Sequence, residues 1–283
     1  MRRFHIAVVA LALLSSAAMM SSPVRAADNP DLVEFELMTW AEVKAAQEAG
    51  KTTALFYTGG TEQRGPQNAN GGHNMMARAI VKAIAEKLGN AIAIPVLPFS
   101  PTGMSADLPG SLDLPADLLA PVLEQLAEDA ITIGFKNVVL MGDSGGGQPT
   151  VYGGVAKKLD DKYKAEGIRV FYANEVYTKA NSEFNDILMA EGHPRSAHGA
   201  LLDTSLMYYL DTDNKYVRRD LLPTAVGDPV LPRGEKPPAD YKSVNNGITG
   251  DARKSSPEIG KRFFDHKIAI AVTQIEGFLA ETK

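Results

Sequence analysis

The sequence predicts a three-layer α/β/α fold in which a mainly parallel central sheet lies between two layers of helices. Short apolar runs of strand length alternate along the chain with longer segments whose apolar residues recur at helical spacing. In addition, 45% of the residues are hydrophobic and 22% are charged, as in ordinary globular proteins. Strands that alternate with helices pair in parallel, and the connecting helices then cover both faces of the sheet.

The first half of the chain supplies two strand–helix pairs. Residues 53–57 form a short apolar run that indicates a buried strand, and residues 74–88 follow with apolar side chains at helical spacing. A second apolar run over 91–97 predicts the next strand. Residues 115–133 again show helical periodicity, and Gly134 ends this helix.

The second half repeats this alternation. Residues 137–141 are nearly all apolar, which predicts a central strand that is covered on both faces. We expect a helix over 151–166, a strand over 169–173 and a last helix over 258–280. Residues 223–250 are rich in Pro, Gly and Asn and predict a long surface excursion, either a lid or an oligomer contact.

The first 26 residues are expected to be a signal peptide. A basic start at Arg2 and Arg3 precedes a short apolar run over 6–14 and a small-x-small pattern that ends at Ala26. The apolar run is too short for a membrane span, which needs about 20 residues. We therefore expect residues 1–26 to be removed and residues 27–283 to form a single domain that is periplasmic or secreted.

Composition excludes several kinds of site. The chain has no cysteine, so disulfides, zinc ribbons, iron–sulfur clusters and a cysteine nucleophile are ruled out. A transition-metal site must then use histidine and carboxylate ligands. The formal charge is −5, and removal of the three arginines of residues 1–26 makes it −8. An acidic chain without basic tracts is a poor nucleic-acid binder, so we expect a small-molecule substrate, no nucleic-acid partner and no membrane span after cleavage.

Three polar, glycine-containing loops follow the first three predicted strands. They cover residues 58–74, 98–114 and 142–150. Ligands of open α/β sheets bind beyond the carboxyl ends of the strands, so we expect the site to lie where these loops meet.

The first loop contains Glu62 and His73, which are potential metal ligands, and Glu62 is also a potential base. A surface Glu and a helix-capping His are the alternative. Ser144 lies in a Gly-Asp-Ser-Gly-Gly string like that of trypsin-like proteases, but a loop between strand and helix is the wrong context for it. This loop is equally compatible with a phosphate bound by backbone N–H groups. His198 precedes an apparent helix and is either a general base or a structural histidine.

Five segments that occur in order resemble the creatininase family, the creatinine amidohydrolase-like metal-dependent hydrolases. Among them are the Gly-Thr-Glu-Gln-x-Gly-Pro of the first loop and the His-Gly-x-x-x-Asp-Thr-Ser-Leu-Met that starts at His198. The resemblance runs from about Met38 to the C-terminus. The five segments are residues 60–66, 108–114, 134–142, 198–207 and 246–253.

The resemblance implies a creatininase-like fold, hydrolysis of a C–N bond and a homo-oligomer. It also implies a two-metal centre held by a Glu, a nearby His, a bridging Asp, a His after the central strand and a further carboxylate. In this chain Glu62 keeps the Glu, whereas Arg64 replaces the nearby His and His73 replaces the Asp. The sequence therefore indicates a divergent member with an altered metal-ligand set.

Two further positions of the implied centre also differ. The His after the central strand aligns with Ser144, or with Asp143 if the glycines shift by one, and the next acid is Gly146 or is lost. The histidine of the catalytic loop is kept as His198.

The fixed charge of Arg64 disfavours a second metal ion. A single Zn or Mn ion on Glu62, His73 and Asp143 remains a possible set. In the leading interpretation, this exported protein hydrolyses an amide, including a cyclic one, in a small molecule. Water bound to one metal ion, or activated by His198, attacks the carbonyl, and Arg64 stabilises the oxyanion or holds an anionic substrate.

Two alternatives remain open on the sequence alone. In a metal-free serine hydrolase, Ser144 is the nucleophile, His198 is the base, and Asp143 or Asp203 orients the base. In a non-catalytic periplasmic binding or assembly protein, the fold survives and Glu62 and His198 are relics.

Overall fold

Four parallel strands form the centre of the molecule in the computed structural model, which describes residues 31–104, 107–232 and 234–281. Their order across the sheet is β2–β1–β3–β4. All four predicted strands are present. The strands are β1 (Thr53–Thr58), β2 (Ala91–Ala93), β3 (Asn137–Gly142) and β4 (Arg169–Tyr172).

Strand β2 is shorter than the sequence predicted. The apolar run continues to Leu97, but Pro95 has no backbone N–H and cannot continue a hydrogen-bonded ladder. Pairing resumes only as a single parallel bridge between Thr58 and Leu97. The chain beyond Ala93 therefore serves as a loop that leads to the carboxyl edge of the sheet.

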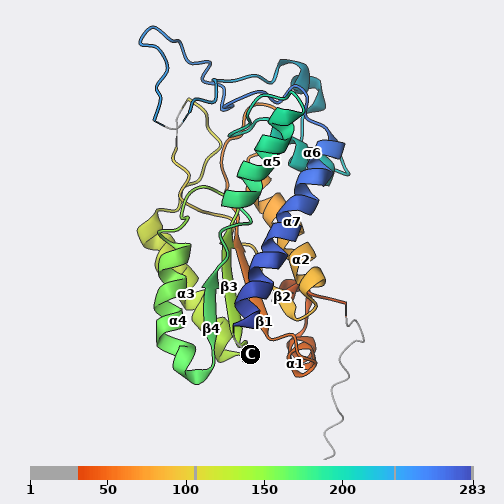
Figure 1. Cartoon of the computed structure of the whole chain (residues 1–283), viewed down its shortest axis with the longest axis vertical. Coiled ribbons are helices and arrows are strands. Elements are labelled where there is room, and N and C mark those ends of the chain that lie inside the picture. Colours follow the sequence, from red (N-terminus) through yellow and green to blue (C-terminus); the bar gives the residue numbers. More distant parts are fainter. Residues whose placement is uncertain (1–30, 105–106, 233, 282–283) are drawn as a thin grey trace, which may run out of the picture.

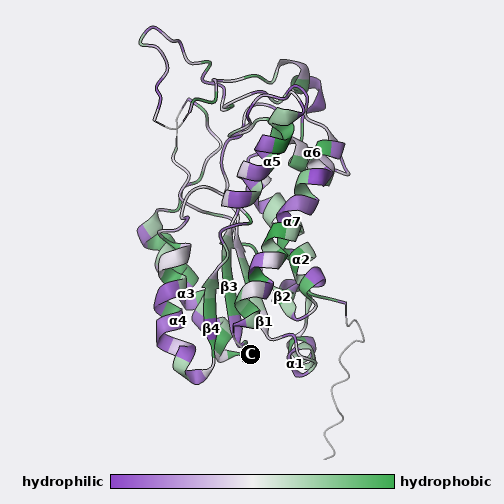
Figure 2. Ribbon diagram, viewed as in Figure 1, coloured by the Kyte–Doolittle hydropathy of each residue, from purple (hydrophilic) through white to green (hydrophobic). Residues whose placement is uncertain are grey.

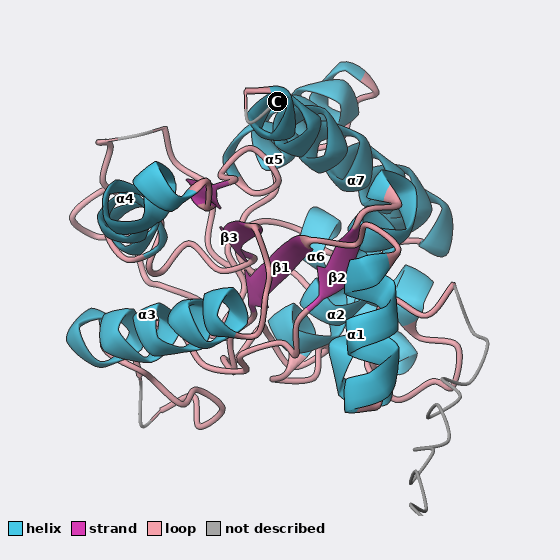
Figure 3. Ribbon diagram, turned by 90° about the horizontal axis from the view of Figure 1, so that it is seen from below, coloured by secondary structure: helices cyan, strands magenta, loops and turns pink. Residues whose placement is uncertain are grey.

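Helices cover both faces of the sheet, which confirms the predicted three-layer α/β/α arrangement (Figures 1 and 3). Alternate strand residues point to opposite faces. Phe56 and Leu140 pack on one face among residues of α3 (Ala116–Thr132) and α4 (Tyr152–Tyr163). Leu55 and Val139 pack on the other face with α2 (Gly72–Leu88), α6 (Leu201–Leu210) and α7 (Pro257–Ala280). The strands are accordingly apolar along their length in Figure 2.

Two helices were not predicted. The first is α1 (Trp40–Glu48), which starts with a capping box in which Thr39 and Glu42 bond to each other's backbone N–H groups. The second is α5 (Thr178–Ala190), whose buried Ala180, Phe184 and Leu188 recur every four residues. Both signals are present in the sequence. Short 3₁₀ turns at 35–37, 164–166 and 219–224 complete the helical elements of the described residues.

The three loops that follow β1, β2 and β3 meet at the carboxyl edge of the sheet, as expected for parallel strands (Figure 1). The long segment over 223–250 contains the end of the last 3₁₀ turn and otherwise only isolated bridges. Its ends are not a simple surface excursion, because Ala225 and Ile248 are buried against Ala200. The segment thereby supports the backbone that carries His198.

The predicted signal peptide and its cleavage position lie outside the described residues. Among the helices of the described ranges, none combines the length and the apolar character that a membrane crossing requires.

Candidate active site

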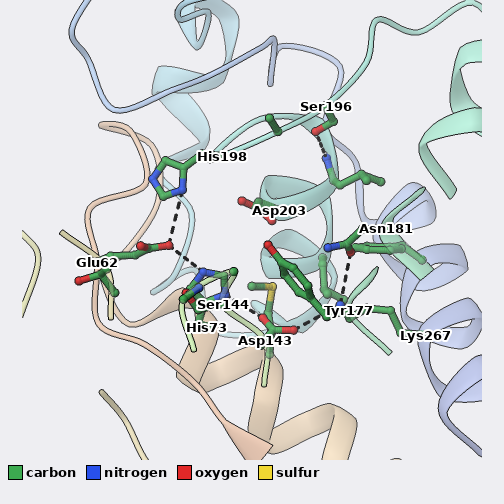
Figure 4. A pocket seen from close by; sticks show the side chains of 18 of the residues that line it. Glu62, His73, Asp143, Ser144, Tyr177, Asn181, Ser196, His198, Asp203 and Lys267 are labelled. Carbon is green, nitrogen blue, oxygen red and sulfur yellow. Dashed lines mark hydrogen bonds and ion pairs between the residues drawn. The ribbon is translucent and has the colours of Figure 1, made fainter. Parts of the chain in front are cut away.

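A cavity of about 420 Å³ opens at the carboxyl edge of the sheet. The loop after β1 contributes Glu62, and the loop after β3 contributes Asp143 and Ser144. The opposite wall comes from α5, the residues before α6, and α7 (Figure 4). The loops that follow the strands therefore form one side of the cavity, as expected, and two helices from the second half of the chain contribute to the other side.

His73 lies at the start of α2 and bridges two carboxylates. Its Nε2 is 2.7 Å from Glu62 Oε1, and its Nδ1 is 2.8 Å from Asp143 Oδ2. A carboxylate only accepts, so simultaneous hydrogen bonds to both require a proton on each ring nitrogen. Burial and the charge of Arg64 lower the pKa of His73, but the hydrogen bonds to Asp143 and Glu62 outweigh them and raise it. His73 is therefore an imidazolium between two anions.

Asp143 is a buried carboxylate that several groups hold in the charged state. Lys267 Nζ is 3.3 Å from its Oδ1, and the Tyr57 hydroxyl donates to the same oxygen at 3.1 Å. Burial alone raises the pKa of Asp143, but the Lys267 charge and the hydrogen bond from His73 lower it far below its ordinary range. Asp143 thus stays ionised and is a very weak base.

Arg64 is completely buried behind the cavity. Its Nη2 lies 2.5 Å from Asp203 Oδ2, and its Nη1 lies 3.6 Å from Glu62 Oε1. Two glycines make room for it, because a Cβ on Gly72 would approach Arg64 Cδ to 2.9 Å and one on Gly199 would approach Arg64 O to 2.9 Å. The guanidinium does not line the cavity, so its charge acts on the substrate through Glu62 and Asp203 rather than by contact.

His198 lines the cavity with one ring nitrogen fixed by the backbone. Its Nε2 lies 2.6 Å from the carbonyl oxygen of Gln63, and a carbonyl only accepts, so Nε2 carries a proton. The neutral ring therefore has its lone pair on Nδ1, which lies 3.5 Å from Glu62 Oε1. The backbone of the histidine is held as well, because Thr249 N–H donates to His198 O at 2.8 Å.

The charge of Glu62 is stabilised from three sides. Burial raises its pKa, whereas the hydrogen bond from His73, the charges of His73 and Arg64, and the charge of His198 when that ring is protonated, lower it to a net value below the ordinary one. All of these contacts reach Oε1. The second oxygen, Oε2, accepts no hydrogen bond from the part of the chain that the structure describes.

The structure brings Glu62, His73 and Asp143 together but does not arrange them as metal ligands. A shared ion requires the three donor atoms to converge on one point. Here the imidazole itself stands between the carboxylates, and its two nitrogens point in opposite directions, one to each acid. Across the described ranges, no group of three or more His, Asp or Glu side chains is placed to hold a metal ion. The donor set in this arrangement does not fit the expected Zn or Mn ion.

The proposed pairing of Ser144 and His198 is not assembled either. The Ser144 hydroxyl accepts from Gly146 N–H at 3.3 Å. His198 donates one nitrogen to a carbonyl and turns the other toward Glu62. No hydrogen bond joins the serine to the histidine in the described structure, and Asp203, a candidate orienting acid, pairs with Arg64 instead. Asp143, the other candidate, pairs with His73 and Lys267.

Several residues of the cavity were missed from the sequence, and three of them share one wall. Lys267 on α7 and Tyr177 and Asn181 at the start of α5 form the wall opposite Glu62 and His198 (Figure 4). A signal existed for Lys267, because it falls four residues after Phe263 and three before Ile270 on the buried stripe of its helix. A lysine on such a stripe is rare unless it is paired.

A family model described as "Creatininase: Creatinine amidohydrolase" matches residues 36–275 of the chain. No curated protein sequence matches the chain.

Solved structures of creatininases share the fold. One, described as a creatinine amidohydrolase (creatininase), is 20% identical with a TM-score of 0.63 and covers 86% of this chain and 96% of its own. A mutant creatininase of Zn-Zn type is 20% identical with a TM-score of 0.67, covering 87% of this chain and 98% of its own. A structure described as creatininase Mn, also 20% identical, has a TM-score of 0.63 and the same coverage.

Proposed function

Because the chain belongs to the creatininase family, we propose that it is a hydrolase that cleaves a C–N bond of amide type in a small polar molecule. The reaction uses side chains and backbone groups of the chain, without a metal ion. The observation that carries this proposal is the setting of His198, which lines the cavity with one nitrogen held as a donor and the other 3.5 Å from Glu62 Oε1, a second lining residue.

His198 is the general base in this proposal. The Gln63 carbonyl fixes the proton on Nε2, so Nδ1 is the nitrogen that accepts a proton from a water molecule in the cavity. Glu62, 3.5 Å from Nδ1, stabilises the imidazolium that results. The other two acids of the site are weak bases. Asp143 is paired with Lys267 and Asp203 with Arg64, and these cations lower the pKa of each carboxyl group, so that neither readily takes up a proton.

The loop after β3 supplies donors for the developing oxyanion. Ser144 and Gly145 line the cavity, and their N–H groups donate to no acceptor within the described ranges. Such preorganised N–H groups stabilise a tetrahedral intermediate without reorganisation. The proton taken up by His198 is then available for the leaving nitrogen.

The test is hydrolysis of a panel of small linear and cyclic amides by the purified protein in the presence of a chelator. His198→Gln is expected to lower the rate about 100-fold or more, because a general base contributes on that scale. His193→Gln is the matched control, since His193 lies outside the cavity lining. Equal rates for His198→Gln and the parent protein would exclude His198 as the base.

A second candidate is a binding protein without turnover. It is favoured by the pairing of every acid in the cavity with a cation: Glu62 and Asp143 with His73, and Asp203 with Arg64. A site balanced in this way has no strongly basic carboxylate. Saturable binding of the same amides, with no hydrolysis by the parent protein or by the His198→Gln and His193→Gln variants, would establish this candidate.

We also propose that the protein is exported and assembles as a homo-oligomer. The support is the signal-like composition of residues 1–26 and the family resemblance. N-terminal sequencing of the protein from the producing cell is expected to start at residue 27, and light scattering after size exclusion gives the number of subunits. An intact N-terminus at Met1 would contradict export by cleavage.

A further inference from the structure

We propose that Lys267, Tyr177 and Asn181 form a subsite that binds a carboxylate group of the substrate. The proposal rests on the proposed function, since it names a class of substrate for the same cavity. The three residues come from α5 and α7 and lie across the cavity from Glu62 and His198 (Figure 4).

Lys267 is buried, with 2% of its surface exposed, yet it lines the cavity. Its Nζ lies 3.3 Å from Asp143 Oδ1 and 3.5 Å from Asn181 Oδ1, both beyond the usual length of a charged hydrogen bond. An ammonium group has three protons to donate. The rings of Phe263 and Tyr177 also approach Nζ, with centroids at 5.1 and 5.9 Å. The described residues therefore give this desolvated cation two long oxygen contacts and no short one beside the cavity, which is a costly arrangement without a ligand.

Tyr177 and Asn181 add neutral donors next to this cation. Burial, and after it the charges of Asp203 and Asp143, raise the pKa of Tyr177 to about 12, so its hydroxyl keeps its proton at neutral pH. That hydroxyl donates to no acceptor in the described structure. Asn181 lies one helical turn later and turns Oδ1 toward Lys267, which leaves its amide NH₂ group as a donor.

The chain also keeps space in front of the Tyr177 hydroxyl. A Cβ on Gly145 would lie 2.9 Å from this oxygen, so any larger residue at 145 would fill the space. Gly145 is thus suited both to a substrate group at Tyr177 and to the approach of its own N–H to the substrate. The two features place the carboxylate and the reacting carbonyl of one small molecule in the same cavity.

The surrounding charges favour a carboxylate over a phosphate. Asp143 and Asp203 both face the cavity, and a dianion would be repelled more strongly than a monoanion. A carboxylate instead accepts from Lys267 and from the two neutral donors in a charge-assisted contact. The inferred substrate class is a small amide that carries one carboxylate group.

The experiment compares two probes that differ only in this group, N-acetylglycine and N-acetylglycinamide. Calorimetric titration of the parent protein is expected to show at least 10-fold tighter binding of the acid. Tyr177→Phe should reduce this preference several-fold, and Lys267→Met should abolish it, whereas Lys267→Arg should retain part of it. Lys261→Met, on the exposed side of the same helix, is the control and should bind as the parent does.

Equal affinity of the parent protein for the two probes would overturn the proposal. It would also be overturned if Tyr177→Phe and Lys267→Arg, as two separate variants, both kept the full preference of the parent protein for the acid. Tyr177→Phe keeps every charge, so it remains a valid test if Lys267→Met fails to fold. Because binding is measured without turnover, failure of the subsite is distinct from failure of hydrolysis. Preference for the acid without hydrolysis would refute the proposed function and leave the subsite standing.

Discussion

At the scale of single residues, the centre of the site is an alternation of opposite charges. Lys267, Asp143, His73 and Glu62 follow one another at distances between 2.7 and 3.3 Å. Buried ions of this kind are tolerated only as partners, because removal of one leaves the next uncompensated. The cations of the chain thereby supply positive charge around Glu62 and Asp143.

Replacement of His73 by glutamine is expected to destabilise the protein by about 3 kcal/mol, since two buried carboxylates lose their common partner. Urea unfolding followed by circular dichroism measures the change. His266→Gln is the matched control and should cost less than about 1 kcal/mol, because His266 faces the exposed Glu183 at 3.4 Å. A cost for His73→Gln no larger than that of the control would contradict the importance of the bridge.

The sequence identified Glu62, His73, Asp143 and His198 as site residues, and all four line the cavity. Their roles were harder to predict. In a sequence, a histidine near two acids is equally compatible with a metal ligand and with an ion-pair partner of the two carboxylates. That choice depends on the direction of the two ring nitrogens, which only the packing of α2 against the loops decides. Arg64 was expected to touch the substrate, but the neighbouring glycines allow it to lie behind the acids instead.

At the scale of elements, loops packed through glycine shape the cavity. The loop after β3 lies against the loop after β2 so closely that a Cβ on Gly146 would be 1.7 Å from the carbonyl oxygen of Pro101. No side chain fits there without separating the two loops. The N–H groups that border the cavity depend on this contact for their position.

Gly146→Ala is therefore expected to destabilise the protein by about 1–3 kcal/mol through overpacking and to lower hydrolysis. Gly154→Ala provides a control of the opposite sign. Gly154 lies in α4 with open space around it, so alanine there should stabilise the helix by about 0.5–1 kcal/mol. Thermal melts and rates on one amide compare both variants, and a neutral Gly146→Ala would refute the close contact.

Strand and helix periodicity predicted the elements that alternate regularly. The structure contains these elements, and their first and last residues lie within a few residues of the predicted ones. The exceptions have identifiable causes. Pro95 ended β2 early inside a continuous apolar run, and α5 was overlooked because polar residues at 181–183 interrupt its apolar pattern. Missing α5 meant missing Tyr177 and Asn181, so an error in an element became an error in the site.

At the scale of the whole molecule, stability is expected to depend on pH in two directions. Glu62, Asp143 and Asp203 have lowered pKa values, so their contribution is present above about pH 4 and is lost as the pH falls through their folded values. The pKa of His73 is raised, so its contribution is present below about pH 6.5 and is lost as the pH rises through the folded pKa.

Urea unfolding from pH 3 to pH 9 should therefore show the largest free energy of unfolding between about pH 4 and pH 6.5 as far as these groups are concerned. His73→Gln should remove the decline on the alkaline side, whereas His193→Gln should keep it. A parent curve that stays level from pH 6 to pH 9 would show that His73 is not held as a cation.

The melting temperature of the protein is also expected to stay the same when metal ions are removed. A metal ion bound only by the folded state would raise the melting temperature, and a chelator would lower it. We expect no measurable change with a chelator or with added Zn²⁺ or Mn²⁺, and metal analysis should find less than one ion per chain. A stoichiometric ion that resists dialysis, with a lower melting temperature after its removal, would contradict the geometry at His73.

The contact between Asp143 and Lys267 has a consequence for how the protein matures. Asp143 follows β3, whereas Lys267 belongs to α7, which is synthesised later. Until that helix docks, the Asp143 carboxylate at the edge of the sheet has His73 but lacks its second cationic partner. Truncation before α7 would therefore remove both the cover of α2 and the charge that Asp143 requires. The working site therefore forms only after α7 has been synthesised and has docked, so a chain released before that point lacks it.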